Sequence, residues 1–188
     1  MRWEDIDQQV CSVARTLAVV GDRWTLLILR DAFLGTHRFE DFRRQLGVSR
    51  HRLTERLNKL VDTGVLERVL YQQRPPRYEY RLTAKGLDLH GVVLMLGDWG
   101  NRWCSDESGA PVEYRHRTCG QLVRPMLSCS ECGEPMAPTT VSPEVGPGLQ
   151  QALACGVGMF AELGEGVELH EKLPPLLYKS LTRKPEAS

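Results

Sequence analysis

Hydrophobic residues recur at helical spacing through the first third of the chain. The pattern predicts helices over residues 9–19, 22–34, 39–46 and 49–63. The second of these is apolar on most of its faces, so we expect it at the centre of the core. Only Gly47 and Val48 separate the third helix from the fourth. Two helices joined by such a short glycine-containing turn are typical of a helix-turn-helix.

The fourth predicted helix has one apolar and one polar side. Leu53, Leu57, Leu60 and Val61 fall on one side at spacings of three and four residues. Ser49 is the predicted N-cap of this helix, and Gly64 its predicted C-terminal stop. The opposite side carries His51, Arg52, Glu55, Asn58 and Lys59, with Arg50 and Arg56 on its flanks.

Two β-rich runs follow this helix, at residues 65–70 and 78–82. The loop between them contains two prolines and has Arg74 and Arg77 at its ends. A helix with polar and cationic groups outward, followed by a basic hairpin, is what a winged helix needs to hold duplex DNA. Thr83 then begins a long helix that we expect to run to Trp103. Its apolar positions cover more than one intramolecular face requires, so we expect it to meet a partner subunit together with residues 9–20.

The fold expected is mainly α with a small β-wing, a winged helix-turn-helix, which carries two appendages. Residues 8–104 form the DNA-binding and dimerisation domain, residues 112–138 a small zinc-ribbon-like β module, and residues 139–188 an irregular or helical tail. Within the tail, residues 149–154 and 157–163 are apolar enough for short helices. Its acidic, proline-containing end is expected to be ordinary surface.

Charge is distributed unevenly along the chain. The formal net charge is +0, but residues 1–104 hold 17 Lys and Arg against 13 Asp and Glu, and residues 38–81 hold 11 against 6. A local cationic excess is compatible with DNA binding despite the neutral total. No apolar run is long enough for a membrane span, and the first residues lack a signal-peptide core, so we expect a cytoplasmic protein.

Several runs of residues carry a resemblance to a known family. They are Cys11-Ser12-Val13, GDRWTLLILRDAFLGTHRFEDFRR, LTERLNKLVDTGVLER and PPRYEYRLTAKG. Over residues 8–103 the chain resembles the HxlR-type winged-helix transcriptional regulators of bacteria, which are relatives of the MarR group. The resemblance implies a homodimeric repressor or activator on a pseudo-palindromic operator. Ser12 departs from the proline that many members have there, which should loosen the start of the first helix slightly.

Groove geometry then gives each candidate DNA contact a role. Helix 49–63 would enter the major groove with its N-terminal residues first, and wing 71–78 would lie near the minor groove. Base edges would be read by Arg50, His51, Arg52 and Glu55. Phosphates would be met by Arg43, Arg44, Arg56 and Lys59, and the minor groove by Arg74 and Arg77. Two alternatives stay open: these arginines are only a solvated helix face, or the chain is a winged-helix interaction module without DNA binding.

A second chemical pattern lies beyond the winged helix. The first half of the pattern is H-x2-C-G, in which His116 and Cys119 are followed by a glycine. The second half is C-x2-C-G, in which Cys129 and Cys132 are followed by another glycine. Three thiolates and one imidazole are the ligand set of a closed structural zinc site, so we expect Zn²⁺ at these four residues. The alternatives are a small hairpin whose metal has been lost, or a thiol-based redox protein that uses Cys129 and Cys132.

Cys11 is a third candidate for chemistry. It precedes a helix, where the macrodipole favours a thiolate, and in several relatives of this type a cysteine at the matching position senses oxidants or electrophiles. The alternative is a small buried residue at a helix start. Cys104 and Cys155 carry no pattern. No catalytic triad order, phosphate loop or paired acid/base carboxylates is recognisable, so we predict no enzymatic activity.

Overall fold

The computed structural model describes residues 3–144 and 146–155. They form two compact units. The first holds residues 3–7 and 13–125, and the second holds residues 8–12 and the described residues from 126 onward. Among the described residues, none of the helices has both the length and the apolar character that crossing a bilayer demands.

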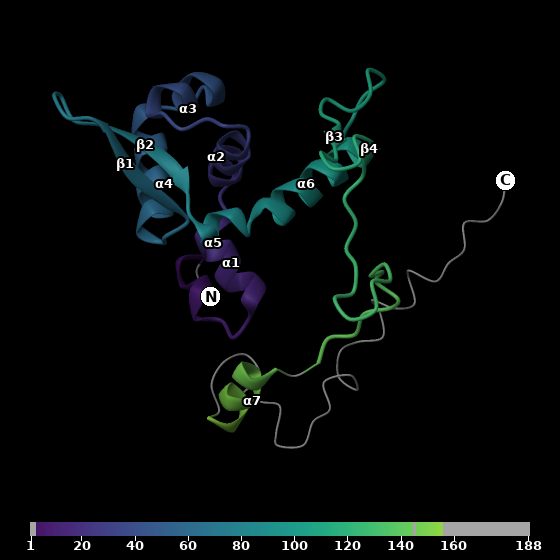
Figure 1. Ribbon diagram of the computed structural model, residues 1–188. Helices are drawn as coiled ribbons and strands as arrows, with labels where there is room; N and C mark the ends of the chain where they lie inside the picture. The colour runs from purple at the N-terminus through teal and green to yellow at the C-terminus, as the bar shows by residue number, and fades with distance from the viewer. Residues whose placement is uncertain (1–2, 145, 156–188) are drawn as a thin grey trace. The chain divides into compact units, whose positions relative to one another are not determined.

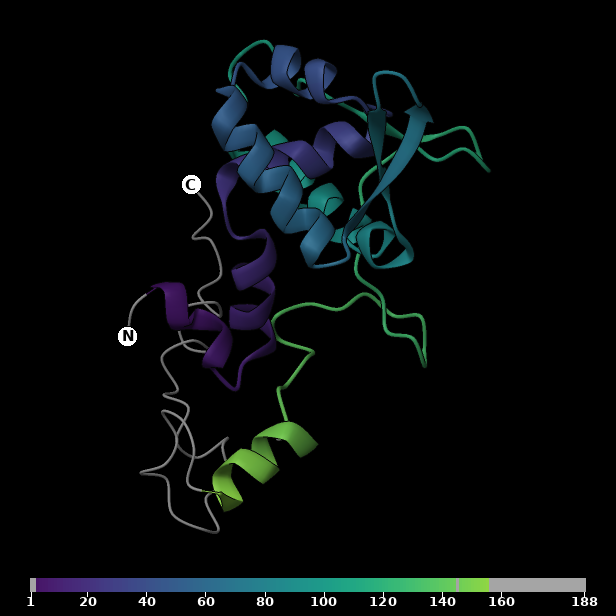
Figure 2. The same ribbon diagram turned by 90° about the vertical axis from the view of Figure 1, so that its left-hand side faces the viewer.

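Four helices follow a short 3-10 turn, Trp3–Gln8. They are α1 (Ser12–Val20), α2 (Arg23–Phe33), α3 (Phe39–Leu46) and α4 (Arg50–Asp62). Asp22 caps α2, because its carboxylate accepts a hydrogen bond of 2.9 Å from the Trp24 N–H. Ile28 and Leu29 of α2 are fully buried, which confirms that α2 lies at the centre of the core. Figure 2 shows α3 and α4 as neighbours over α2.

The connection between α3 and α4 is the tight turn that the sequence predicts. Gly47 ends α3 with φ of 62°, the left-handed region that favours glycine, and its N–H bonds to Arg43 O at 3.0 Å. Val48 is buried, and the Ser49 hydroxyl accepts from the Arg52 N–H at 3.4 Å as the N-cap of α4. Leu53, Leu57 and Leu60 are all fully buried. The apolar side of α4 therefore faces the core and its polar side faces outward.

The wing is an antiparallel hairpin of β1 (Leu66–Gln72) and β2 (Arg77–Leu82), with Leu66 opposite Leu82 and an irregularity between Leu70 and Gln72. Its loop projects beyond the helices (Figure 1). The Tyr80 N–H donates to His37 O at 2.8 Å, so the segment before α3 adds to the edge of β2. The winged helix-turn-helix fold expected from the sequence is confirmed.

The helix expected from Thr83 to Trp103 is two helices, α5 (Ala84–Leu87) and α6 (His90–Trp103). Thr83 caps the first as predicted, since its hydroxyl accepts from the Gly86 N–H at 3.1 Å. The Leu89 N–H then bonds to Gly86 O at 3.1 Å, a bond to the third residue back that tightens the chain and separates the two helices.

A small second hairpin follows α6, formed by β3 (Tyr114–Arg115) and β4 (Leu122–Val123). In the other unit, Ser128 and Pro135 form an isolated antiparallel bridge. There α7 (Pro147–Ala154) includes the short helix predicted over residues 149–154. The helix predicted over 157–163 and the acidic end lie outside the described residues.

Candidate nucleic-acid interface

The exposed face of α4 carries the side chains that the sequence assigned to base reading. Arg50, His51, Arg52 and Glu55 are all exposed. They are exposed because the leucines that alternate with them at helical spacing are buried in the core. Three of the four lie in the first turn of α4, the end that a recognition helix presents to base edges.

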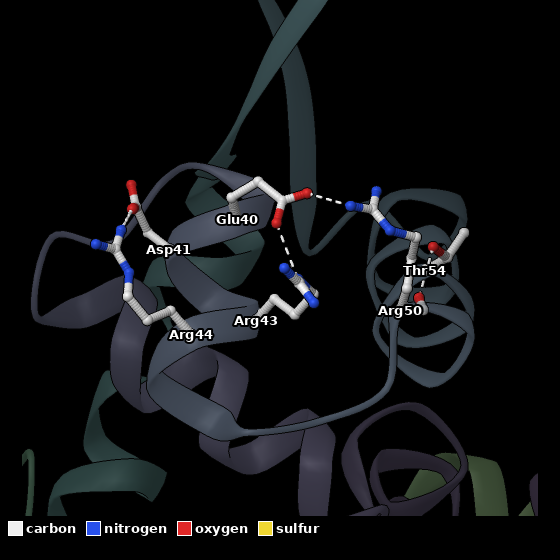
Figure 3. Close-up of polar contacts among 6 residues, drawn as sticks. All are labelled: Glu40, Asp41, Arg43, Arg44, Arg50 and Thr54. Carbon is white, nitrogen blue, oxygen red and sulfur yellow. Dashed lines mark hydrogen bonds and ion pairs between the residues drawn. The ribbon is translucent and has the colours of Figure 1, made fainter.

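Glu40 connects α3 to the start of α4. One of its carboxylate oxygens accepts from Arg43 Nε at 2.8 Å, and the other accepts from Arg50 Nη2 at 2.5 Å (Figure 3). The Arg50 guanidinium also lies over the Phe39 ring, 5.1 Å from its centroid. The hydrogen bond from Arg43, reinforced by the one from Arg50, holds the pKa of the Glu40 carboxyl below its ordinary value. Two of the predicted DNA contacts therefore share one carboxylate.

Other predicted contacts also have an acidic partner. Arg44 pairs with Asp41 on α3 (Figure 3). His51 Nε2 lies 3.6 Å from a Glu55 oxygen one turn along α4. Half-buried Arg56 points back toward α2, where its Nε lies 3.2 Å from Asp22.

Four of the predicted DNA contacts have no acidic partner among the described residues. Within the described residues, no ion pair is formed by Arg52, Lys59, Arg74 or Arg77, and all four side chains are exposed. Exposed guanidinium and ammonium groups without a carboxylate partner are available for phosphate oxygens or base edges.

Aromatic rings and two further arginines lie on the wing or against it, near its loop. The Arg38 guanidinium lies over the Tyr71 ring at 4.7 Å and pairs with Glu79 at 3.3 Å, and the Arg68 guanidinium lies over the Tyr78 ring at 4.3 Å. Hydrogen bonds from Arg81 and then Arg38 lower the pKa of the Glu79 carboxyl. Arg38 was not predicted from the sequence, because its contacts are with strand residues far along the chain.

The wing and the start of α4 border one cleft. It lies between the beginning of α3, the first residue of α4 and the loop end of the hairpin, and its lining residues are Arg38, Phe39, Glu40, Asp41, Arg50, Tyr71, Pro76, Arg77, Tyr78 and Tyr80. Of the arginines in that lining, Arg77 comes from the wing and Arg50 from α4. The structure therefore brings a predicted wing contact and a predicted helix contact to the same concave surface.

An apolar stripe remains exposed on α6. Val92, Leu96, Trp99 and Trp103 follow one another at helical spacing and are 45%, 50%, 54% and 70% exposed. On α1, Val13 and Leu17 are also exposed, at 68% and 40%. Exposed apolar rows of this kind mark interaction surfaces.

The predicted zinc ligands lie in two turns of the same build. In the first, the His116 N–H donates to Gln121 O at 2.9 Å and the Gly120 N–H to His116 O at 2.8 Å. The second turn has the same two bonds at the same spacing. The Cys129 N–H donates to Glu134 O, five residues along, at 2.9 Å, and the Gly133 N–H donates to Cys129 O, four residues back, at 2.9 Å. Gly120 and Gly133 have φ of 70° and 75°, the left-handed region that favours glycine.

Side chains within each turn are arranged as a pair. His116 Nδ1 lies 3.3 Å from Cys119 Sγ. In the other turn the N–H groups of Cys132 and Glu131 donate to the Cys129 sulfur and lower the pKa of that thiol. The two turns belong to different units. In the part of the chain that the structure describes, no group of three or more His, Cys, Asp or Glu side chains lies close enough to hold a metal ion.

Cys11, the predicted sensor, is exposed and directly precedes the first residue of α1. The expectation that it is a small buried residue is therefore wrong. Cys104 and Cys155 are exposed as well.

The chain is similar to transcriptional regulators. The HxlR-like helix-turn-helix family model matches residues 19–108. The HTH-type transcriptional regulator Rv3095 of Mycobacterium tuberculosis is 46% identical over 143 residues, which cover 76% of this chain and 90% of the relative. The HTH-type transcriptional regulator YdeP of Bacillus subtilis is 36% identical over 98 residues, 52% of this chain and 77% of the relative.

Two solved structures have a similar fold. One is PA1607, described as a transcription factor, with a TM-score of 0.67 and 35% identity over 74% of this chain and 98% of that chain. The other is the transcription factor PA1374 from Pseudomonas aeruginosa, with a TM-score of 0.54 and 39% identity over 75% of this chain and 99% of that chain. Both matches cover more of the chain than the family model does, so the likeness extends beyond the helix-turn-helix.

Proposed function

Because the chain belongs to the HxlR-like helix-turn-helix family of transcriptional regulators, we propose that it binds a pseudo-palindromic operator as a homodimer. In this proposal α4 enters the major groove and the wing lies near the minor groove. The observation that carries the proposal is the shared cleft, to which α4 contributes Arg50 and the wing contributes Arg77. Two cationic elements on one concave surface can follow the backbone of a single duplex.

Base reading belongs to the exposed residues in the first two turns of α4. Arg52 has no carboxylate partner among the described residues and is free to bond bidentately to guanine O6 and N7, while Glu55 can accept from cytosine N4. Arg43, Arg44, Arg56 and Lys59 supply phosphate contacts, and Arg74 and Arg77 supply the wing contacts. This division separates residues that set sequence preference from residues that set affinity.

Dimerisation uses the apolar rows of α6 and α1. A row that includes two exposed tryptophans is costly to leave in water, and aromatic residues contribute most of the binding energy in many interfaces. A second copy of the same chain would cover it with an identical row, as a twofold interface requires.

Two further properties stay proposals. His116, Cys119, Cys129 and Cys132 are proposed to bind a structural Zn²⁺; the support is the repeated turn geometry and the thiol and imidazole donor set. Cys11 is proposed to respond to oxidants or electrophiles, supported by its exposure beside a helix start. No catalytic role is proposed for any residue.

The direct test is selection of DNA from genomic fragments by the purified full chain, followed by binding measurements on the recovered duplex. We expect a sequence-specific complex whose affinity falls steeply as the salt concentration rises. Failure to enrich any sequence, together with no affinity for random duplex, would favour the interaction-module alternative.

A further inference from the structure

Glu40 occupies an unusual position for an acidic residue in a DNA-binding surface. It lies in the first turn of α3, in the cleft between α4 and the wing, and its carboxylate is bonded to Arg43 and to Arg50 (Figure 3). The Arg50 bond crosses from α3 to the first residue of α4. The side chains of Glu40 and Arg50 are 54% and 65% exposed, so water and a DNA phosphate can both reach the pair.

Arg43, Arg50 and Glu40 together carry less positive charge than a count of the arginines alone suggests. Two guanidinium groups with one carboxylate carry a single net positive charge. A phosphate approaching Arg50 or Arg43 is repelled by the carboxylate between them, and it must share each guanidinium with a hydrogen bond that already exists. Contacts to phosphate supply essentially all non-specific affinity for duplex DNA. The carboxylate therefore weakens binding to any sequence.

A base edge interacts with Arg50 differently from a phosphate, because it carries no negative charge. Guanine O6 and N7 are neutral acceptors, and a guanidinium has more donors than one carboxylate oxygen uses. The Glu40 bond and the Phe39 ring hold the Arg50 guanidinium at the start of α4 while the remaining N–H groups stay available. Held in this way, Arg50 loses less freedom when it reads a base than a mobile arginine would.

We propose that Glu40 is a specificity-determining residue of the DNA-binding surface. By sharing its carboxylate between Arg43 and Arg50, it suppresses phosphate contacts that carry no sequence information and orients Arg50 for one base position in each half-site. The inference rests on the proposed function, because it concerns how the same surface distinguishes one duplex from another.

The adjacent acidic residue provides a matched control. Asp41 also lies in the first turn of α3 and pairs with Arg44 on the same helix. No ion pair within the described residues joins Asp41 to α4. Asp41→Asn therefore removes the same charge, one residue away, without releasing Arg50.

The experiment measures the affinity of wild type, Glu40→Gln and Asp41→Asn for the selected operator and for a random duplex, over a range of salt concentrations. For Glu40→Gln we expect random-duplex affinity to rise roughly threefold or more, with a salt slope steeper by about one per subunit. Operator affinity should change by less than about twofold, so the ratio of specific to non-specific affinity falls. Preference at one base position per half-site should relax. Asp41→Asn should steepen the salt slope while leaving every base preference unchanged.

A double variant isolates the contact itself. In an Arg50→Ala background, Glu40→Gln should no longer alter base preference, because the arginine that it positions is gone. The inference is overturned if Glu40→Gln leaves the salt slope and random-duplex affinity at wild-type values, or if it and Asp41→Asn change base preference equally. If the wild-type protein binds neither duplex, both the proposed function and this inference are overturned. If the wild-type protein binds DNA and Glu40→Gln binds both duplexes as wild type does, only the inference is overturned.

Discussion

The hydroxyl group of Tyr114 occupies the space that a Cβ atom would take at Gly97, so the β3–β4 hairpin lies directly against α6. Two polar contacts accompany this approach. Asn101 Nδ2 donates to Val112 O at 2.7 Å, and Arg124 Nε donates to the buried Asp98 carboxylate at 3.1 Å. The hairpin that carries His116 and Cys119 is thereby attached to the helix proposed to form the dimer.

Gly97→Ala should therefore destabilise the protein. The added methyl group would collide with the Tyr114 hydroxyl group, and forced displacement of packed groups typically costs roughly 1–3 kcal/mol. Gly100→Ala is the control on the same helix, since a Cβ there would meet nothing within 4 Å; it should be neutral or stabilise by about 0.5–1 kcal/mol. Urea unfolding, with hydrogen exchange at Leu122 and Val123, measures both. Equal stability of the two variants would contradict the contact.

Arg52→Ala should weaken operator binding by about 1–3 kcal/mol and relax the preference at one base pair of each half-site. The reason is the loss of a bidentate contact to a base edge. Fluorescence anisotropy on the operator and on single-base variants provides the measurement. Lys59→Ala is the control, because loss of a phosphate contact should weaken all sequences about equally. An Arg52→Ala protein that keeps wild-type affinity and preference would show that this side chain does not enter the groove.

Trp99→Glu should disrupt the homodimer. Trp99 is 54% exposed in the single chain, and truncating a central aromatic residue of an interface commonly costs about 2 kcal/mol or more. A buried carboxylate adds a desolvation penalty on both subunits. Sedimentation velocity across a concentration series reports the shift to monomer. Leu34→Glu, at an exposed leucine outside α1 and α6, serves as the control and should stay dimeric. A Trp99→Glu dimer of wild-type stability would place the interface elsewhere.

Cys129→Ser should release the proposed metal. Wild type purified under reducing conditions should contain about one zinc ion per chain, since three thiolates and an imidazole complete a tetrahedral site. Elemental analysis of wild type, Cys129→Ser and the control Cys104→Ser distinguishes the ligands from an unrelated thiol. Metal content in Cys129→Ser equal to wild type would refute the ligand set. Metal-free wild type whose Cys129 and Cys132 cycle to a disulfide would support the redox alternative instead.

Treatment with diamide or a quinone should lower the DNA affinity of wild type severalfold and leave Cys11→Ser unaffected. Cys11 is exposed and adjoins the start of α1, so an oxidant can reach it. Cys104→Ser, which removes another exposed thiol, should keep the wild-type response. Equal responses of wild type and Cys11→Ser would eliminate the sensor proposal.

Hydrophobic spacing was sufficient to predict most of the winged helix. Leu53, Leu57 and Leu60 recur at the helical period, and burial of all three fixes which face of α4 is exposed. Ser49 and Thr83 marked two helix starts for the same local reason, as the hydrogen bonds that their hydroxyl groups accept show. Such features depend on residues within one turn of one another.

Features that depend on distant residues were not predictable in this way. The bond from Glu40 to Arg43 follows helical spacing, but the bond from Glu40 to Arg50 depends on how α3 meets α4. Arg38 contacts Tyr71 and Glu79 only because the segment before α3 adds to the edge of β2. The break between α5 and α6 accompanies the backbone hydrogen bond from the Leu89 N–H to Gly86 O, which side-chain periodicity does not encode.

Hydroxyl-radical footprinting of the full chain on its selected operator tests the central claim most directly. A symmetric dimer that inserts α4 of each subunit into the major groove predicts two protected half-sites related by a dyad, with centres about 10–10.5 base pairs apart or a multiple of that spacing. The wings predict further protection in the adjacent minor grooves. A single protected half-site, or protection with no dyad, would contradict the account.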